Sequence, residues 1–420
     1  MPKFLIEGGI PLQGEITVSG SKNAALPILA ACLLTDQPCT IKNVPDIADV
    51  RSMLKLMELL GTKTNFQHGT AIIQAKTMKN VPIHDPVVKK FRASILLLGP
   101  LLARMKEVKL DFPGGCILGK RSIHAHMHVL SELGGEILED KEHIHLRRSK
   151  NLKGKEVIMS EISVTATENA IMSASLAEGT TEIRLAAAEP HVQDLCHFLN
   201  RMGAHIKGIG THTLTIRGVS KLKGASHRIT PDYLEVGALA LASVLTGGTV
   251  TINDIESHHL DAFWNKLAET GAKFSLEPHR VTLYPSDELR PLAKLRTAVY
   301  PSFPTDLQAP FAVLLTQAKG ESHIFETLFE GRLNYLFELE KMGAKVEIVN
   351  PHQARINGQT PLGAVPVASC DIRAGTAMVL AALIAKGETE VSNVYYIDRG
   401  YDRLDEKLRK LGAKIKRIEV

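Results

Sequence analysis

Long apolar segments and short segments of alternating polarity follow one another along the whole chain. Six apolar segments are rich in alanine and nearly apolar on every helical face, and they cover residues 21–34, 92–103, 165–177, 231–245, 305–318 and 372–385. A helix that is apolar all round is normally buried, so these segments predict six buried helices. Strict alternation of apolar and polar residues, as in residues 345–349, predicts strands between them.

A glycine marks the end of a second, more polar helix in each part of the chain. These glycines are Gly61, Gly134, Gly203, Gly271, Gly343 and Gly412, and successive ones lie 68 to 73 residues apart. Glycine just past a helix end is a common left-handed cap. The chain is therefore predicted to contain six repeats of about 70 residues, each a buried helix, a strand, a surface helix and further strands. We expect an α/β protein with two globular domains of three repeats each.

Composition narrows the class of protein. The 420 residues are 44% apolar and 23% charged, which is ordinary for a globular protein. The net charge of +5 comes from scattered basic residues, which argues against nucleic-acid binding. The apolar runs are too short to span a membrane, and the first residues lack a signal-peptide pattern. Because the five cysteines are irregularly spaced, we expect neither a disulfide framework nor a zinc motif, and we expect a cytoplasmic protein.

Polar residues at the starts of the buried helices occupy near-equivalent positions of the repeat. They are Lys22, Arg92, Thr165, Asp232, Asp306 and Arg373. Ser21 is a candidate N-cap of the first helix. The pairs Thr165 with Glu168 and Thr305 with Gln308 have the spacing of a capping box.

These helix starts are a candidate anion site, because helix N-termini present unpaired N–H groups. If the two domains face each other through these ends, the cleft between them would collect Lys22, Arg92, Arg121 and Arg373, with Arg332 and Arg399 from later loops. A carboxylate among so many cations stays ionised, so Asp306 and Asp371 are candidate bases or orienting groups. The alternative is that each residue is a capping or surface charge.

Cys116 lies in an unusual segment, residues 111–121, which contains three glycines and a proline. These residues favour a turned or mobile loop. The neighbouring Lys120 and Arg121 would lower the pKa of the thiol and favour a reactive thiolate. From the local chemistry alone, a reactive cysteine and an inconsequential exposed one remain equally open.

Three histidines alternate at His124, His126 and His128. His124 and His128 are one helical turn apart, but no carboxylate pattern such as His-Glu-x-x-His accompanies them. We therefore expect no metal site here.

Seven motifs stand in one order along the chain. They are Ser19–Pro27, Arg92–Ser94, Pro113–Cys116, Thr167–Asn169, Phe303–Asp306, Asp371–Gly375 and Asp398–Tyr401. Together they resemble the UDP-N-acetylglucosamine enolpyruvyl transferases (1-carboxyvinyltransferases) from end to end. The resemblance implies the inside-out α/β barrel of the enolpyruvyl transferase fold. It places one domain at 22–229, carrying the Cys116 loop, and the other at 1–21 plus 230–420, with the active site in the cleft between them.

The same resemblance implies a reaction. Phosphoenolpyruvate would transfer its enolpyruvyl group to the 3′-hydroxyl of UDP-N-acetylglucosamine through a tetrahedral intermediate, and phosphate would leave. This is the first committed step of bacterial peptidoglycan synthesis. The resemblance implies neither a metal nor an organic cofactor.

Site residues follow from the resemblance position by position. Asp306 would accept the hydroxyl proton, and Cys116 would act as an acid at C3 or assist product release and be alkylated by fosfomycin. Phosphoenolpyruvate would be held by Lys22, Asn23, Arg121, Arg332, Arg373 and Arg399, of which Lys22 and Arg399 are also catalytic. UDP-N-acetylglucosamine would contact Arg92, Arg121, Ser122, Ile123, His124, Ala125, Ser163, Val164, Thr165, Asp306 and Leu328.

The chain departs from the family pattern on the nucleotide side. Residues 122–126 read Ser-Ile-His-Ala-His where the family has Pro-Val-Asp-Leu-His, so a carboxylate and a proline are lost. Thr165 stands where the family has a glycine beside the diphosphate. The phosphoenolpyruvate side is nearly unchanged.

Three alternatives to this reaction stay open. The chain could transfer enolpyruvyl groups to another nucleotide or sugar nucleotide. 5-Enolpyruvylshikimate-3-phosphate synthase activity fits less well, because Asn23 and the Cys116 loop point away from it. A binding protein without activity would not need to keep both Cys116 and Asp306.

Overall fold

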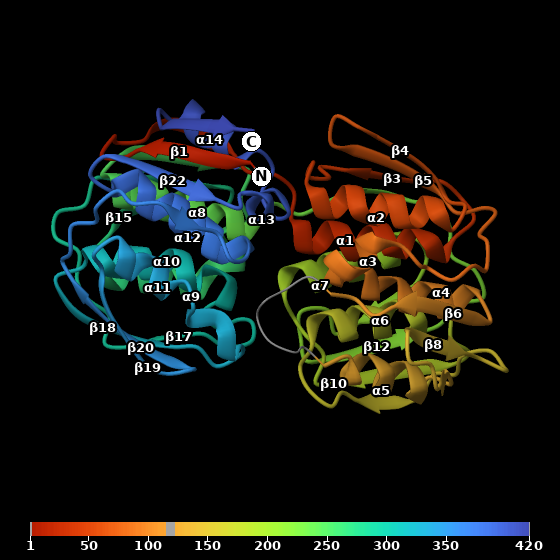
Figure 1. Cartoon of the computed structure of the whole chain (residues 1–420). Helices are drawn as coiled ribbons and strands as arrows, with labels where there is room; N and C mark the ends of the chain where they lie inside the picture. The colour runs from red at the N-terminus through yellow and green to blue at the C-terminus, as the bar shows by residue number, and fades with distance from the viewer. Residues whose placement is uncertain (1, 115–121, 420) are drawn as a thin grey trace. The chain divides into compact units, whose positions relative to one another are not determined.

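The computed structural model describes residues 2–114 and 122–419, except for the side chain of Lys90. Cys116 and Arg121 lie outside the described residues. The chain forms two compact units (Figure 1). Apart from residues 115–121, the first unit runs from Gly20 to Thr230, and the second combines the residues up to Ser19 with those from Pro231 onward.

The first unit contains three repeats. Its elements are α1 (Lys22–Ala31), η1 (Cys32–Leu34), β3 (Cys39–Lys42), α2 (Ala48–Leu59), β4 (Lys63–Gln67), β5 (Thr70–Gln74), α3 (Pro86–Lys90), η2 (Arg92–Leu97), α4 (Leu98–Arg104), β6 (Glu107–Asp111), α5 (His124–Glu132), β7 (Glu136–Leu138), β8 (His143–Arg147), β9 (Glu156–Ile158), α6 (Val164–Ala174), β10 (Thr180–Arg184), α7 (Pro190–Arg201), β11 (His205–Lys207), β12 (Thr213–Arg217) and β13 (Ser226–Arg228). Its described sheets have the strand orders β13-β3-β5-β4, β6-β8-β7 and β11-β12-β10-β9.

The second unit also contains three repeats. Its elements are β1 (Lys3–Glu7), β2 (Gln13–Thr17), α8 (Tyr233–Thr246), β14 (Thr249–Asn253), η3 (Ser257–Leu260), α9 (Asp261–Glu269), β15 (Lys273–Glu277), β16 (Arg280–Tyr284), β17 (Leu295–Arg296), η4 (Thr305–Leu307), α10 (Gln308–Gln317), β18 (Gly320–Phe325), η5 (Glu330–Leu333), α11 (Leu336–Lys341), β19 (Lys345–Asn350), β20 (Gln353–Gly358), β21 (Val367–Ala368), α12 (Ile372–Ile384), β22 (Glu388–Ser392), α13 (Tyr395–Asp398), α14 (Leu404–Lys410) and β23 (Lys414–Ile418). Its described sheets have the orders β15-β16-β14-β2, β17-β18-β20-β19 and β21-β22-β1-β23.

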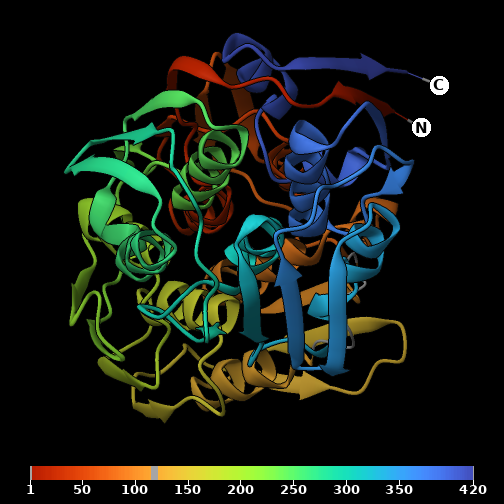
Figure 2. The ribbon, with the colours of Figure 1, turned by 90° about the vertical axis from the view of Figure 1, so that its left-hand side faces the viewer.

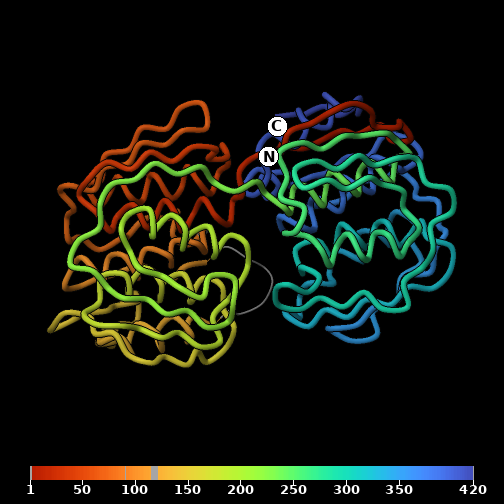
Figure 3. The backbone as a smooth tube through the Cα atoms, turned by 180° about the vertical axis from the view of Figure 1, so that it is seen from behind, coloured from red at the N-terminus to blue at the C-terminus, as the bar shows by residue number. Residues whose placement is uncertain are grey.

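The two N-terminal strands complete sheets whose other strands come from the last half of the chain. β2 runs parallel to β14, and β1 lies between β22 and β23 and is antiparallel to both. Lys3 is paired with Ile418, so the chain ends lie side by side in the backbone trace (Figure 3). The first residues of the chain are thus part of the second unit.

Each unit is built around three buried helices. In the second unit α8, α10 and α12 contact one another and are surrounded by sheets and surface helices (Figure 2). In the first unit α1, α4 and α6 hold the corresponding places in the core. The six described sheets and six buried helices confirm the predicted repeat.

The repeat glycines have the backbone conformation that their sequence position predicts. Gly61, Gly134, Gly203, Gly271, Gly343 and Gly412 all have positive φ, between 83° and 107°. A side chain is strained in this region, and glycine is not. The second helix of each repeat therefore ends where the sequence indicates.

Candidate functional site

Asp306 joins two arginines that are far from it in the sequence. It lies in the short helix η4, Arg332 lies in η5, and Arg373 is the second residue of α12. Arg332 Nη2 contacts Asp306 Oδ1, and Arg373 donates from Nε to Oδ2 over 3.1 Å. The Arg373 Nη2 atom is also 3.0 Å from Oδ2. Each carboxylate oxygen thus accepts from a different guanidinium.

The two arginines are almost fully enclosed, whereas the carboxylate is partly open. The side chains of Arg332 and Arg373 are 4% and 5% exposed, and that of Asp306 is 27% exposed. Burial by itself lowers the pKa of Arg373, but Asp306, together with Tyr401 and Asp232, outweighs burial and raises it. Arg373 therefore stays charged in the protein interior.

Two nitrogens of these guanidinium groups have no acceptor in the part of the chain that the structure describes. Among the described residues, Arg332 Nε and Arg373 Nη1 are buried without a hydrogen-bond acceptor. Each guanidinium group lies against an aromatic ring. The Cζ atom of Arg332 is 5.3 Å from the centre of the Phe329 ring, and that of Arg373 is 5.3 Å from the centre of the Tyr401 ring. Two buried cations with one carboxylate between them form a site that suits an anion with several oxygens.

Asp371 and Asp232 serve as helix caps. Asp371 accepts from the backbone N–H groups of Arg373 and Ala374, over 2.7 and 2.9 Å. Asp232 accepts from those of Leu234 and Glu235. Asp371 thus caps the first turn of α12, which carries Arg373.

Two other predicted residues lie in the same unit. Arg399 is buried and directly follows α13. Leu328 is 38% exposed, and its backbone N–H donates to Glu326 Oε1 over 2.9 Å. An exposed leucine beside a polar site offers a contact for an apolar part of a ligand.

Lys22 is the first residue of α1, in the first unit. Its ammonium lies 2.7 Å from Asp49 Oδ2, and the two side chains are only 10% and 5% exposed. Ser21 caps this helix by accepting from the backbone N–H of Ala24, which confirms the predicted N-cap. Asn23 is the second residue of α1 and is partly buried.

Arg92 opens η2 and donates to the backbone carbonyl of Ser122 over 3.1 Å. Ser122 Oγ in turn accepts from the backbone N–H of His124, at the start of α5. Ile123 precedes α5 and is partly buried, whereas Ala125 is buried. The segment that departs from the family pattern is thus tied to Arg92.

The Thr165 hydroxyl forms a hydrogen bond with His126 rather than with a backbone N–H of its own helix. Its Oγ1 lies 3.1 Å from His126 Nε2, while Asn169 Nδ2 donates to His126 Nδ1 over 2.9 Å. The ring is thus a neutral Nε2–H imidazole, and burial together with the charge of Arg92 lowers its pKa to about 3. Helix α6 begins at Val164 after Ser163, whose side chain makes no capping bond.

Both predicted capping boxes are therefore wrong. Glu168 is buried in α6, and Thr305 Oγ1 donates to Glu326 Oε2 over 2.8 Å. Gln308 is also buried, and its side-chain amide has no partner among the described residues. In each helix a tertiary contact has replaced the local capping bond.

Glu168 is a buried acid that the sequence did not mark as chemically unusual. Its Oε1 atom has no partner among the described residues. Burial, followed by repulsion from Glu189, raises its pKa well above the ordinary value. A carboxyl near the start of a helix is a common sequence feature, so only its burial distinguishes Glu168.

The other cysteines of the chain are poorly suited to nucleophilic chemistry. Cys32 and Cys196 are buried, and burial raises the pKa of both thiols, that of Cys196 to about 12. The pKa of Cys370 is raised to about 11, mainly by burial. A hydrogen bond with Cys32 lowers the pKa of Cys39, but Cys39 is fully enclosed.

A cavity of about 470 Å³ lies at the other ends of the first unit's buried helices. It is lined by residues that follow α1 and α6, including Thr35 and Glu178, and by Arg104 at the end of α4. None of the predicted site residues lines this cavity.

Within the described residues, no helix has the length and apolar character needed to cross a bilayer.

Comparison with known proteins assigns the chain to a family. The family model for EPSP synthase (3-phosphoshikimate 1-carboxyvinyltransferase) matches residues 6–408. The UDP-N-acetylglucosamine 1-carboxyvinyltransferase of Koribacter versatilis is 43% identical over 422 residues, which cover 100% of this chain and 97% of that relative. The same enzyme of Methylacidiphilum infernorum is 43% identical over 424 residues, covering 100% and 99%.

Solved structures agree on the fold. The enolpyruvyl transferase NikO from Streptomyces tendae superposes with a TM-score of 0.89 at 24% identity, covering 100% of this chain and 99% of that one. EPSP synthase from Acinetobacter baumannii superposes with a TM-score of 0.77 at 16% identity, covering 100% of both. The structural likeness confirms the α/β enolpyruvyl transferase fold, and the full-length identity is specific: the chain belongs to the UDP-N-acetylglucosamine 1-carboxyvinyltransferase family.

Proposed function

We propose that this protein transfers the enolpyruvyl group of phosphoenolpyruvate to the 3′-hydroxyl of UDP-N-acetylglucosamine and releases phosphate, the first committed step of peptidoglycan synthesis in the cytoplasm. The identity of 43% over the whole chain is the main support. The pair of buried arginines around Asp306 is the structural support, because phosphoenolpyruvate carries both a phosphate and a carboxylate.

Asp306 is the proposed base. Without substrate, its two oxygens accept from Arg332 and Arg373. An arriving phosphate or carboxylate would compete for the same guanidinium donors and would also use the donors at Arg332 Nε and Arg373 Nη1. Asp306 would then be released to take the proton of the 3′-hydroxyl as its oxygen bonds to C2 of phosphoenolpyruvate.

The remaining residues divide between the two substrates. For phosphoenolpyruvate we propose Lys22, Asn23, Arg121, Arg332, Arg373 and Arg399. For UDP-N-acetylglucosamine we propose Arg92, Arg121, Ser122, Ile123, His124, Ala125, Ser163, Val164, Thr165, Asp306 and Leu328. Cys116 would give a proton to C3 in the addition step, and loss of a C3 proton with phosphate would complete the transfer.

Phosphate release tests this proposal. Wild-type protein with phosphoenolpyruvate is expected to release phosphate when UDP-N-acetylglucosamine is added. Asp306→Asn should lose nearly all of this activity, since it retains the shape of the side chain and removes the base. Arg51→Ala is the control, because Arg51 forms an exposed pair with Asp46. No release with any acceptor would refute the transferase reaction, and release only with another acceptor would refute the assigned substrate.

Fosfomycin labelling tests the role of Cys116. The raised pKa values of Cys32, Cys196 and Cys370 make these thiols weak nucleophiles, which favours Cys116 as the reactive one. Mass spectrometry should find one fosfomycin adduct on the wild type and on Cys370→Ser, and none on Cys116→Ser. An adduct that persists in Cys116→Ser would assign the reactive thiol elsewhere.

A further inference from the structure

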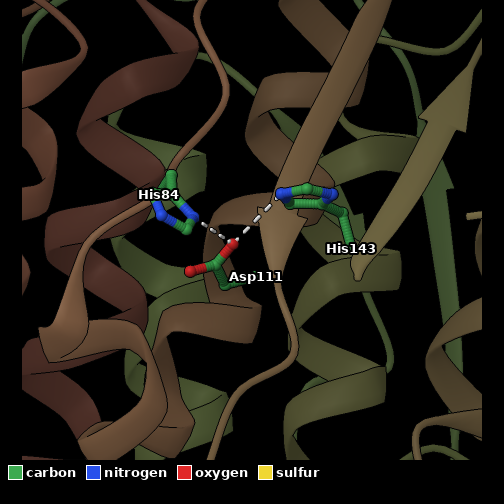
Figure 4. A group of neighbouring side chains, drawn as sticks. All are labelled: His84, Asp111 and His143. Carbon is green, nitrogen blue, oxygen red and sulfur yellow. Dashed lines mark hydrogen bonds and ion pairs between the residues drawn. The ribbon is translucent and has the colours of Figure 1, made fainter. Parts of the chain in front are cut away.

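Three side chains from separate segments meet at one end of the sheet formed by β6, β8 and β7 (Figure 4). Asp111 is the last residue of β6 and is paired in register with His143, the first residue of β8. His84 follows Ile83, which bridges to β6 at Leu110. The sheet thus fixes the backbone on which all three side chains stand.

The ligand atoms have the spacing of a metal site. His84 Nδ1 is 3.0 Å and His143 Nε2 is 3.3 Å from Asp111 Oδ1, and all three atoms lie within 4.8 Å of one another. Ligands at about 2.0–2.1 Å from a tetrahedral zinc ion lie about 3.3 Å apart. We propose that His84, Asp111 and His143 bind a divalent transition-metal ion of the Zn²⁺ type.

The second shell of His143 fits this role. Its Nδ1 atom lies 3.2 Å from Asp140 Oδ1, and that oxygen also accepts from the backbone N–H groups of Glu142 and His143, over 2.9 and 3.0 Å. A histidine that binds a metal commonly donates its other N–H to a carboxylate, which fixes the ring and its tautomer. With an ion bound, His143 Nδ1–H would donate to Asp140, and the lone pair of Nε2, on the Asp111 side of the ring, would bind the ion.

The donor set and its exposure indicate the kind of ion. Two imidazoles and one carboxylate favour zinc, cobalt, nickel or copper over magnesium and calcium, which prefer oxygen ligands alone. The Asp111 side chain is 4% exposed, whereas that of His84 is 73% exposed. An ion would therefore enter beside His84, and water would complete its coordination on that side. It would join three chain segments as a structural cross-link.

A competing interpretation is that the three side chains form hydrogen bonds and ion pairs without a metal. The distances of 3.0 and 3.3 Å from Asp111 to the two histidines are also those of hydrogen bonds. A competing metal site is the His124 and His128 pair of α5, whose ring centres are 6.3 Å apart. That pair offers two ligands, and His128 Nε2 is already 3.0 Å from the carbonyl oxygen of Ile158. His124→Gln therefore serves as the matched control.

Calorimetric titration of Zn²⁺ into tag-free, chelator-treated full-length protein tests the proposal. We expect one strong site in the wild type and in His124→Gln, with affinity reduced at least about 10-fold in His84→Ala and His143→Gln. His84 is exposed and the Asp111–His143 pair remains without it, so His84→Ala should fold normally. Co²⁺ should give the intense visible bands of tetrahedral coordination in the wild type and lose them in His84→Ala.

Thermal unfolding gives an independent measure. Zn²⁺ should raise the unfolding midpoint of the wild type and of His124→Gln by the same amount, and raise that of His84→Ala by less. The proposal is overturned if the wild type binds no Zn²⁺, if His84→Ala binds it as tightly as the wild type, or if the strong site disappears in His124→Gln.

Discussion

His126 should make the stability of the protein depend on pH in a way that one substitution removes. The ring is 2% exposed, accepts from Asn169 and donates to Thr165. Burial and the charge of Arg92 lower its pKa from 6.5 to about 3. The perturbation is acidification from pH 7 to pH 5, compared between the wild type and His126→Gln.

The sign follows from which state takes up the proton. Below pH 6.5 the unfolded chain protonates this ring, whereas the folded chain keeps it neutral down to about pH 3. Its contribution to stability is therefore complete above the unfolded pKa and is lost as the pH falls toward the folded pKa. Each pH unit in this range costs about 1.4 kcal/mol, so at pH 5 the loss is about 2 kcal/mol.

Urea unfolding followed by far-ultraviolet circular dichroism at pH 5, 6 and 7 measures this loss. His126→Gln will itself be less stable at pH 7, because Asn169 loses its acceptor on the imidazole ring. The decisive quantity is the change in unfolding free energy between pH 7 and pH 5, which should be about 2 kcal/mol smaller in His126→Gln. His124→Gln on the same helix is exposed and should retain the wild-type change. Equal pH dependence in the wild type and His126→Gln would refute the reasoning.

Three further predictions concern acids and a close backbone contact. Burial, then repulsion from Glu189, raises the folded pKa of Glu168, so the contribution of this carboxyl to stability is complete below the unfolded pKa and is lost as the pH rises through the folded pKa. Between pH 5 and pH 8, urea unfolding should therefore show a smaller loss of stability in Glu168→Gln than in the wild type. Parallel curves of unfolding free energy against pH would contradict this. Asp306→Asn should lower kcat by about 100-fold or more in the phosphate-release assay, as expected for loss of a general base, and near-normal turnover would exclude that role. Gly20→Ala should cost about 1–3 kcal/mol in urea unfolding, because an added Cβ would lie 1.8 Å from the backbone oxygen of Asn43; an unchanged midpoint would mean that the backbone shifts freely.

Local patterns were sufficient to predict the repeat and its buried helices. The helix-capping glycines depend on the preference of one residue type for positive φ, and all six have it. Two buried helices begin with a 3₁₀ segment that the apolar pattern did not predict, at Arg92–Leu97 and Thr305–Leu307. Pro100 and Pro310 lie near the starts of the following α-helices and lack the N–H of an i to i−4 bond, which explains why regular α-helix starts late.

The sequence by itself determined the six repeats, the buried helices and the polar or charged residues at their starts, because these follow from residue type and spacing over a few turns. Only the tertiary structure decided which charges meet. Asp306 pairs with Arg332 and Arg373 across 26 and 67 residues, and Asp111 meets His84 and His143 across 27 and 32 residues. Such pairings depend on how strands and helices pack. The same packing displaced both predicted capping boxes, since the partly buried hydroxyls of Thr165 and Thr305 bond to tertiary partners.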